Sequence, residues 1–129
     1  MLPRLLGISM LLILTSNTGR AAELPVELGV YGEEQGGCTQ MSHWLVFASS
    51  IKAGGGFKSS DYGRCLVLAV QGGGKAFELN LKCGVLSSSE RGERSMSVIV
   101  IPSGRKAFVL REGTGAGQAE IHFRWCRSG

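Results

Sequence analysis

The segment Phe77-Glu78-Leu79-Asn80-Leu81-Lys82-Cys83 has an apolar residue at every odd position and a polar residue at every even position. Because successive side chains of a β-strand point to opposite faces, this alternation is typical of a strand with one buried and one exposed face. The segment Ala119-Glu120-Ile121-His122-Phe123-Arg124-Trp125 repeats the pattern near the end of the chain. No stretch of eleven or more residues shows helical spacing, so we expect an all-β protein.

Short apolar segments between glycine clusters predict five further strands. These are Glu27–Tyr31, Trp44–Ser50, Arg64–Val70, Ser97–Ile101 and Lys106–Arg111. The segments Arg64–Val70 and Ser97–Ile101 are continuous apolar runs, so either both of their faces are buried or the outer face meets a partner. Nearly every connection is compatible with a local hairpin. We therefore expect an antiparallel meander of about seven or eight strands, closed as a small lipocalin-like barrel or folded as a sandwich, with the barrel favoured.

The start of the chain has the features of an export signal. Arg4 precedes a ten-residue apolar core, Leu5–Leu14, and the small residues Gly19 and Ala21 occupy the positions that a signal peptidase requires. Ten apolar residues are too few for a transmembrane helix, which needs about 20. We expect residues 1–21 to be a cleaved signal and residues 22–129 to form one disulfide-tied β domain, periplasmic or secreted, with no stable membrane anchor after cleavage.

Composition limits the classes of partner. The 129 residues are 43% hydrophobic and 19% charged, which fits a single folded domain and excludes a disordered chain. Removal of the signal would remove two arginines and lower the formal net charge from +4 to +2. No run of Lys or Arg remains to follow a phosphate backbone, so we expect no nucleic-acid partner.

The four cysteines predict two structural disulfides, for which three pairings are possible. The midpoint of Cys65 and Cys83 lies at residue 74, inside the turn signal Gly72-Gly73-Gly74-Lys75. A hairpin at this turn would bring Cys65 and Cys83 together on neighbouring strands, which leaves Cys38 to pair with Cys126. Zinc sites usually bring cysteines in close pairs, whereas at least seventeen residues separate any two here.

Residues for acid–base catalysis are scarce. The part of the chain after the signal has two histidines, His43 and His122, and one aspartate, Asp61. A Ser-His-Asp set could be drawn with either histidine, but no G-x-S-x-G motif supports it. Glu33 and Glu34 are interpreted as solvated charges in a glycine-rich loop. We expect no catalytic residue, no metal ligand and no cofactor.

Three aromatic residues lie near glycine-rich loops, and they could form a contact patch: Tyr31, Phe57 and Tyr62. The alternative, which we favour, is that they cap the ends of the barrel. Loops are the usual carriers of contacts on a rigid scaffold. The loops expected to do so are Glu33–Gly37, Gly54–Tyr62 and Ser87–Arg94.

The layout resembles a group of small exported bacterial β-domains of unknown function. The matching features are Leu24-Pro25, Leu28, Tyr31, Cys38, Gly63-x-Cys65, Cys83 at a strand end and Trp125-Cys126. The likeness spans most of residues 24–126. It implies a periplasmic β-barrel-like domain with four cysteines, and it assigns no catalytic residue.

These observations favour a non-enzymatic binding or interaction domain of the bacterial envelope or secretome, with a protein partner in the envelope. It could act as an inhibitor or accessory protein of a secreted or envelope enzyme. A second hypothesis is a binder of small apolar molecules in the barrel interior; it fails if Trp44, Phe77, Phe123 and Trp125 fill that interior. A third, a small hydrolase, requires a histidine, a carboxylate and a nucleophile in one cleft.

Overall fold

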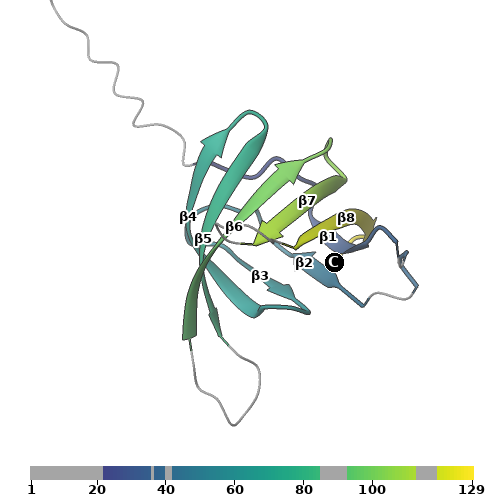
Figure 1. Cartoon of the computed structure of the whole chain (residues 1–129), viewed down its shortest axis with the longest axis horizontal. Helices are drawn as coiled ribbons and strands as arrows, with labels where there is room; N and C mark the ends of the chain where they lie inside the picture. Colours follow the sequence, from purple (N-terminus) through teal and green to yellow (C-terminus); the bar gives the residue numbers. More distant parts are fainter. Residues whose placement is uncertain (1–21, 36, 40–41, 85–92, 113–118) are drawn as a thin grey trace, which may run out of the picture.

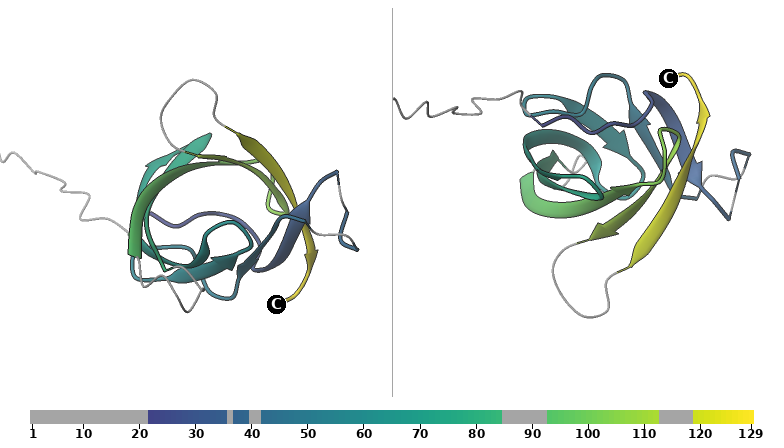
Figure 2. Two further views of the ribbon diagram at one scale, coloured as in Figure 1. Left: turned by 60° about the horizontal axis from the view of Figure 1, so that its bottom comes forward. Right: turned by 90° about the horizontal axis from the view of Figure 1, so that it is seen from above.

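The computed structural model describes residues 22–35, 37–39, 42–84, 93–112 and 119–129. In these ranges eight antiparallel strands form a closed barrel in chain order, and the last strand pairs with the first (Figure 1). The strands are β1 (Gly29–Glu33), β2 (Trp44–Phe47), β3 (Gly56–Ser59), β4 (Gly63–Gly73), β5 (Ala76–Gly84), β6 (Glu93–Pro102), β7 (Ala107–Glu112) and β8 (Glu120–Arg127). The left view of Figure 2 shows them as a ring. The predicted all-β barrel is confirmed.

One strand and several boundaries differ from the prediction. The segment 54–62, expected to be a contact loop, contains β3. This strand has four residues, of which only Phe57 and Ser59 are buried, so the alternation is too short to be recognised. Pairing with β4, with Gly56 opposite Leu66 and Ser59 opposite Gly63, places it in the wall. Similarly, β2 ends at Phe47 rather than at Ser50.

The interior of the barrel is filled by side chains. The largest fully buried ones are Tyr31, Phe47, Phe108, Leu45, Ile51, Leu79, Leu81, Leu110, Val67, Val98 and Val100. Phe77 and Phe123 also belong to this core, whereas Trp44 and Trp125 are half-buried. In small barrels the inward side chains of alternate positions fill the space completely. This packing does not favour the hypothesis of a small apolar ligand inside the barrel.

The two ends of the barrel differ. The turns at 74–75 and 103–106 lie at one end, at the top of Figure 1. The segment before β1 also packs there, since the Leu24 amide donates to the Ile51 carbonyl at 2.9 Å and both side chains are buried. The other end, which we call the loop end, carries the connection 34–43 and the turn 60–62, and β8 begins there at Glu120.

Both predicted disulfides are confirmed. Cys65 and Cys83 are directly opposite in the register of β4 and β5, as the hairpin argument requires. Cys38, in the connection between β1 and β2, is bonded to Cys126 of β8. Two such bonds are consistent with an oxidising compartment, such as the periplasm or the medium. In the described part of the chain, no helix has the length and hydropathy that a membrane span requires. The predicted signal at 1–21 lies outside the described residues.

Candidate functional site

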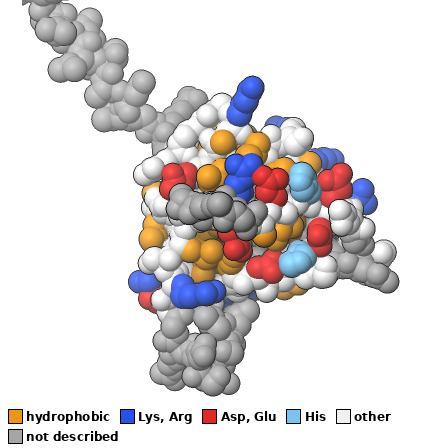
Figure 3. Space-filling view, in the orientation of Figure 1, with side chains coloured by type: hydrophobic (Ala, Val, Ile, Leu, Met, Phe, Trp, Pro, Cys, Tyr) orange, Lys and Arg blue, Asp and Glu red, His pale blue; other side chains and the backbone are white. Residues whose placement is uncertain are grey.

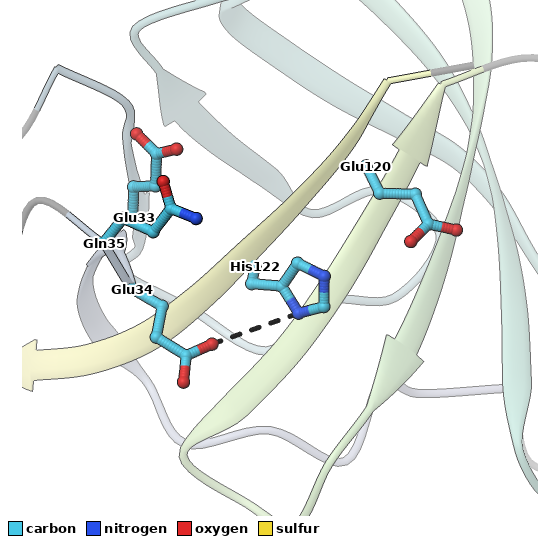
Figure 4. A pocket seen from close by; sticks show the side chains of 5 residues that line it. All are labelled: Glu33, Glu34, Gln35, Glu120 and His122. Atoms are coloured by element: carbon cyan, nitrogen blue, oxygen red, sulfur yellow. Dashed lines mark ion pairs between the residues drawn. The ribbon is translucent and has the colours of Figure 1, made fainter. Parts of the chain in front are cut away.

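An open cleft of about 580 Å³ lies at the loop end. Its lining residues are Glu33, Glu34, Gln35, Glu120 and His122 (Figure 4). The first three are at the end of β1 and in the connection that follows, and the other two are on β8. The Glu34 amide donates a hydrogen bond to the His122 carbonyl at 2.8 Å, which aligns the two walls. The cleft therefore joins the first and last strands of the barrel.

The alternation along β8 creates one wall of this cleft. Phe123 points into the core and is 3% exposed, so His122 and Glu120 point outward. The other wall is the connection after β1. Its Cys38 is bonded to Cys126, which holds this connection against the outer face of β8. The position of the cleft thus depends on strand periodicity and on one covalent bond.

The charges in the cleft are mainly negative. The Glu34 Oε2 and His122 Nδ1 atoms are 4.0 Å apart, and Figure 4 shows these two side chains pointing toward each other. Glu120 extends away from them and accepts a hydrogen bond from Arg111 Nε at 2.9 Å. Glu33 accepts one from the Ser42 hydroxyl at 3.1 Å. Among the described residues, Arg111 is the only lysine or arginine in an ion pair with a carboxylate of the cleft.

A second histidine–carboxylate pair lies at the same end. His43 Nδ1 is 2.9 Å from Asp61 Oδ2 and 3.1 Å from Oδ1. The hydrogen bond to Asp61 raises the pKa of His43 above its ordinary value of 6.5, and the negative charge of Glu33 adds to this effect. Figure 3 shows both histidines of the chain among Asp and Glu side chains on one face. The side of the loop end that carries the cleft therefore combines several carboxylates with two imidazoles.

The His43–Asp61 pair has the orientation of a general base, since the carboxylate holds one ring nitrogen and leaves the other available. A nucleophile would also be required for hydrolysis. The Ser42 hydroxyl is bonded to Glu33, and the Ser60 hydroxyl is bonded to the backbone of Trp44. Within the described ranges, no serine is hydrogen-bonded to either histidine, and every cysteine is in a disulfide. The structure brings His43 and Asp61 together, but among the described residues it places no nucleophile beside them to complete a triad.

Metal binding would need a denser set of ligands. The part of the chain that the structure describes has no group of three or more His, Cys, Asp or Glu side chains placed to hold a metal ion. What the arrangement can do is offer negative charge and hydrogen-bond acceptors in a concave surface. Such a surface recognises a cationic group.

Tyr31, Phe57 and Tyr62 do not form the exposed contact patch that is one of their two interpretations, and their burial agrees with the other interpretation, which we favour. All three side chains are buried, at 0%, 5% and 8% exposure. Tyr31 packs between Phe47 and Phe108, with ring centroids 5.7 and 4.9 Å away. Burial of the large apolar area of these rings is favourable, and buried rings are not available for contacts.

Sequence reasoning did not select the cleft. In the sequence, Glu33 and Glu34 have the pattern of solvated charges, and His122 has that of a polar residue on an exposed strand face. The alternation over 119–125 does place Glu120 and His122 on one face, which is the signal that could have found one wall. The loop prediction Glu33–Gly37 includes the other wall. Their juxtaposition depends on the pairing of β1 with β8, which joins residues about 90 positions apart.

Comparison with known proteins identifies no relative. No family model, no curated protein and no solved structure matches this chain. The resemblance to small exported bacterial β-domains therefore stays a prediction, and the geometry of the loop end is the basis for the functional proposal.

Proposed function

We propose that this chain is an exported, non-enzymatic binding domain whose acidic cleft contacts a basic surface of a partner protein. Its role would be that of an inhibitor or accessory protein of a secreted or envelope enzyme. The observation that carries this proposal is the cleft itself, a concave surface of about 580 Å³ lined by three glutamates at the loop end of a filled barrel. Complementary charge accelerates and orients protein association.

The scaffold supports binding on its outer surface rather than inside it. Core side chains occupy the interior, and two disulfides tie the wall. A rigid barrel with charged residues beside its longer connections is the arrangement by which loops present a recognition surface. Because the contacting groups are already positioned by Cys38–Cys126, less conformational entropy would be lost on binding.

Export is part of the same proposal. Residues 1–21 would direct the chain out of the cytoplasm and be removed there, and the two disulfides would form in the periplasm or the medium. The partner would then be a protein of that compartment.

Site-specific photo-crosslinking tests the proposal. A photo-reactive amino acid at Gln35, in the cleft, should give an adduct with a partner protein in the producing cell. The same group at Lys75, exposed in the turn at the other end of the barrel, should give none. The triple variant Glu33→Gln/Glu34→Gln/Glu120→Gln should lose the adduct, because the negative charge would be removed with little change in shape.

A matched control is Glu23→Gln/Glu27→Gln/Glu78→Gln, which changes the net charge equally but lies outside the cleft. It should retain the Gln35 adduct. Equal crosslinking from Gln35 and Lys75, or an adduct that survives in the cleft variant, would contradict the proposed function.

A further inference from the structure

The outer face of β4 carries two exposed leucines. Leu66 and Leu68 are 46% and 49% exposed, while Cys65 and Val67 between and beside them are buried. Of the two alternatives for this continuous apolar run, burial on both faces is therefore excluded. Adjacent exposed leucines on one sheet face are a feature of interaction surfaces. The run leaves the outer face of β4 available to a partner.

A hollow of about 320 Å³ lies beside this face. It forms because the pairing of β2 with β3 ends at Val46 and Lys58, before Ala48 and Gly56. Most of its lining is apolar, with Val46, Ala48, Phe57 and Cys65 contributing. The hollow lies on β2, β3 and β4, whereas the acidic cleft lies on β1 and β8, so the two surfaces are separate.

Two cations line the same hollow. Lys58 and Arg64 are directly opposite in the register of β3 and β4, and both side chains are exposed. Within the described ranges, neither is in an ion pair, although Lys82, opposite Leu66, is paired with Glu93 at 2.9 Å. Like charges directly opposite each other on a sheet are destabilising. An anionic group between Lys58 and Arg64 would remove this repulsion.

We infer that the outer face of β3 and β4 is a second binding surface, which takes an extended protein segment with alternating apolar and acidic side chains. An apolar side chain of the segment occupies the hollow, its carboxylates lie between Lys58 and Arg64, and the leucines cover its remaining apolar surface. In a face-to-face pair of two copies of the chain, Lys58 and Arg64 of one copy would lie against the same cations of the other and repel them. A flat lipid surface would leave the hollow unfilled. This inference does not depend on the acidic cleft.

Amide chemical shifts of the purified, disulfide-bonded protein test the inference with two blocked pentapeptides. At low salt, acetyl-Glu-Leu-Glu-Leu-Glu-amide should shift the amide signals of β3 and β4. The Kd fitted to these shifts should be about tenfold lower than the Kd of acetyl-Lys-Leu-Lys-Leu-Lys-amide fitted to the same residues. Shifts at the cleft residues, where the basic peptide would bind under the proposed function, are scored separately.

Charge inversion provides the decisive variant. Lys58→Glu/Arg64→Glu should reverse the preference, so that β3 and β4 bind the basic peptide more tightly than the acidic one. Leu66→Ser/Leu68→Ser should raise the Kd of the acidic peptide at least about fivefold. The matched control Lys75→Glu/Arg127→Glu has the same net charge as the first variant but lies outside the hollow, and it should keep the original preference. All six side chains are exposed, so these variants leave the core intact.

Three results would overturn the inference. One is the absence of shifts at β3 and β4, or equal shifts with both peptides. Another is binding to phosphatidylglycerol vesicles. If this binding required Leu66 and Leu68 and the acidic peptide did not inhibit it, the occupant would be a lipid surface. The third is a dimer in sedimentation analysis that Leu66→Ser/Leu68→Ser dissociates, which would identify a second copy.

Discussion

The disulfide between Cys38 and Cys126 joins residues that are 88 positions apart in the sequence and 5.6 Å apart at their Cα atoms. It attaches the connection after β1 to the outer face of β8. On these two elements lie Glu34 and His122, whose Oε2 and Nδ1 atoms are 4.0 Å apart in the cleft. The bond that closes the longest covalent loop of the protein therefore also places the two walls of its candidate site.

Removal of this bond should cost more stability than removal of the other. On the chain-entropy model, Cys38→Ser/Cys126→Ser should lose about 4–5 kcal/mol of unfolding free energy, because it opens a loop of 88 residues. Cys65→Ser/Cys83→Ser, with a separation of 18, should lose about 3 kcal/mol. Urea denaturation monitored by circular dichroism measures both. Equal losses, or a larger loss for the short loop, would show that chain entropy does not dominate.

Asp61 should control the titration of His43. Asp61→Asn replaces the carboxylate, whose hydrogen bond and negative charge raise the pKa of His43, with a neutral amide, so the midpoint of the His43 ring-proton signals should fall toward 6.5. The carboxylate variant Glu27→Gln, far from this ring, is the control and should leave the midpoint unchanged. An NMR titration of the two variants beside the unmodified protein provides the measurement.

The same pair predicts the sign of a pH effect on stability. Because folding raises the pKa of His43, its contribution is complete below about 6.5 and is lost as the pH rises through the folded-state pKa. The unfolding free energies of the protein and of Asp61→Asn should therefore differ more at pH 5.5 than at pH 9. A difference that grows with pH would be incompatible with this assignment.

Both tyrosines should resist ionisation while the protein is folded. Burial raises the pKa of Tyr31 to about 12, and its hydroxyl donates to the Glu27 carbonyl at 2.6 Å. Burial, and then the hydrogen bond to Glu112, raise the pKa of Tyr62 further. At pH 11 the folded protein should show little tyrosinate absorbance at 295 nm, whereas the chain in urea should titrate near 10.

Since both tyrosines bind their protons more tightly in the folded state, stability should fall as the pH rises above about 10. A two-tyrosine ionisation step near pH 10, with an unchanged circular dichroism spectrum, would mean that the rings are exposed to solvent.

Gly29 should tolerate no side chain. Its φ of +139° is unfavourable for other residues, and an added Cβ would overlap the Arg127 carbonyl oxygen and lie 2.5 Å from Trp125 Nε1. That indole nitrogen donates to the Leu28 carbonyl at 3.0 Å, so the overlap would disturb the pairing of β1 with β8. Gly29→Ala should lose about 2–4 kcal/mol in urea denaturation.

Gly74→Ala is the matched control, because Gly74 also has positive φ, at +74°, but an added Cβ would meet nothing within 4 Å. It should lose only about 1 kcal/mol. If the two variants were equally stable, backbone conformation alone, rather than the close approach at Arg127, would explain the requirement for glycine at position 29.

Local patterns predicted the wall of the barrel and one of its bonds. The alternation over 77–83 and 119–125 is confirmed by β5 and β8, and the turn at residue 74 predicted Cys65–Cys83. Cys38–Cys126 then followed by elimination. In contrast, β3 does not stand out in the sequence, because a strand of four residues has too few positions to show a period, and its pairing with β2 and β4 holds it in place.

The aromatic residues show where sequence alone was insufficient. Tyr31, Phe57 and Tyr62 adjoin glycine-rich segments, a position that suits either an exposed patch or a buried cap. The free energy gained by burial decides between them only when the surrounding strands provide a space of matching size. The structure places all three in the core.

The sequence by itself determined the all-β class of fold, the approximate number of strands and the pairing of Cys65 with Cys83, because each follows from periods and turns that are local in the sequence. Only the tertiary structure decided which exposed side chains are neighbours. Closure of the barrel between β1 and β8 sets Glu34 beside His122, and the register of β3 on β4 sets Lys58 opposite Arg64. Pairings of this kind depend on the packing of the whole core, which no local pattern specifies.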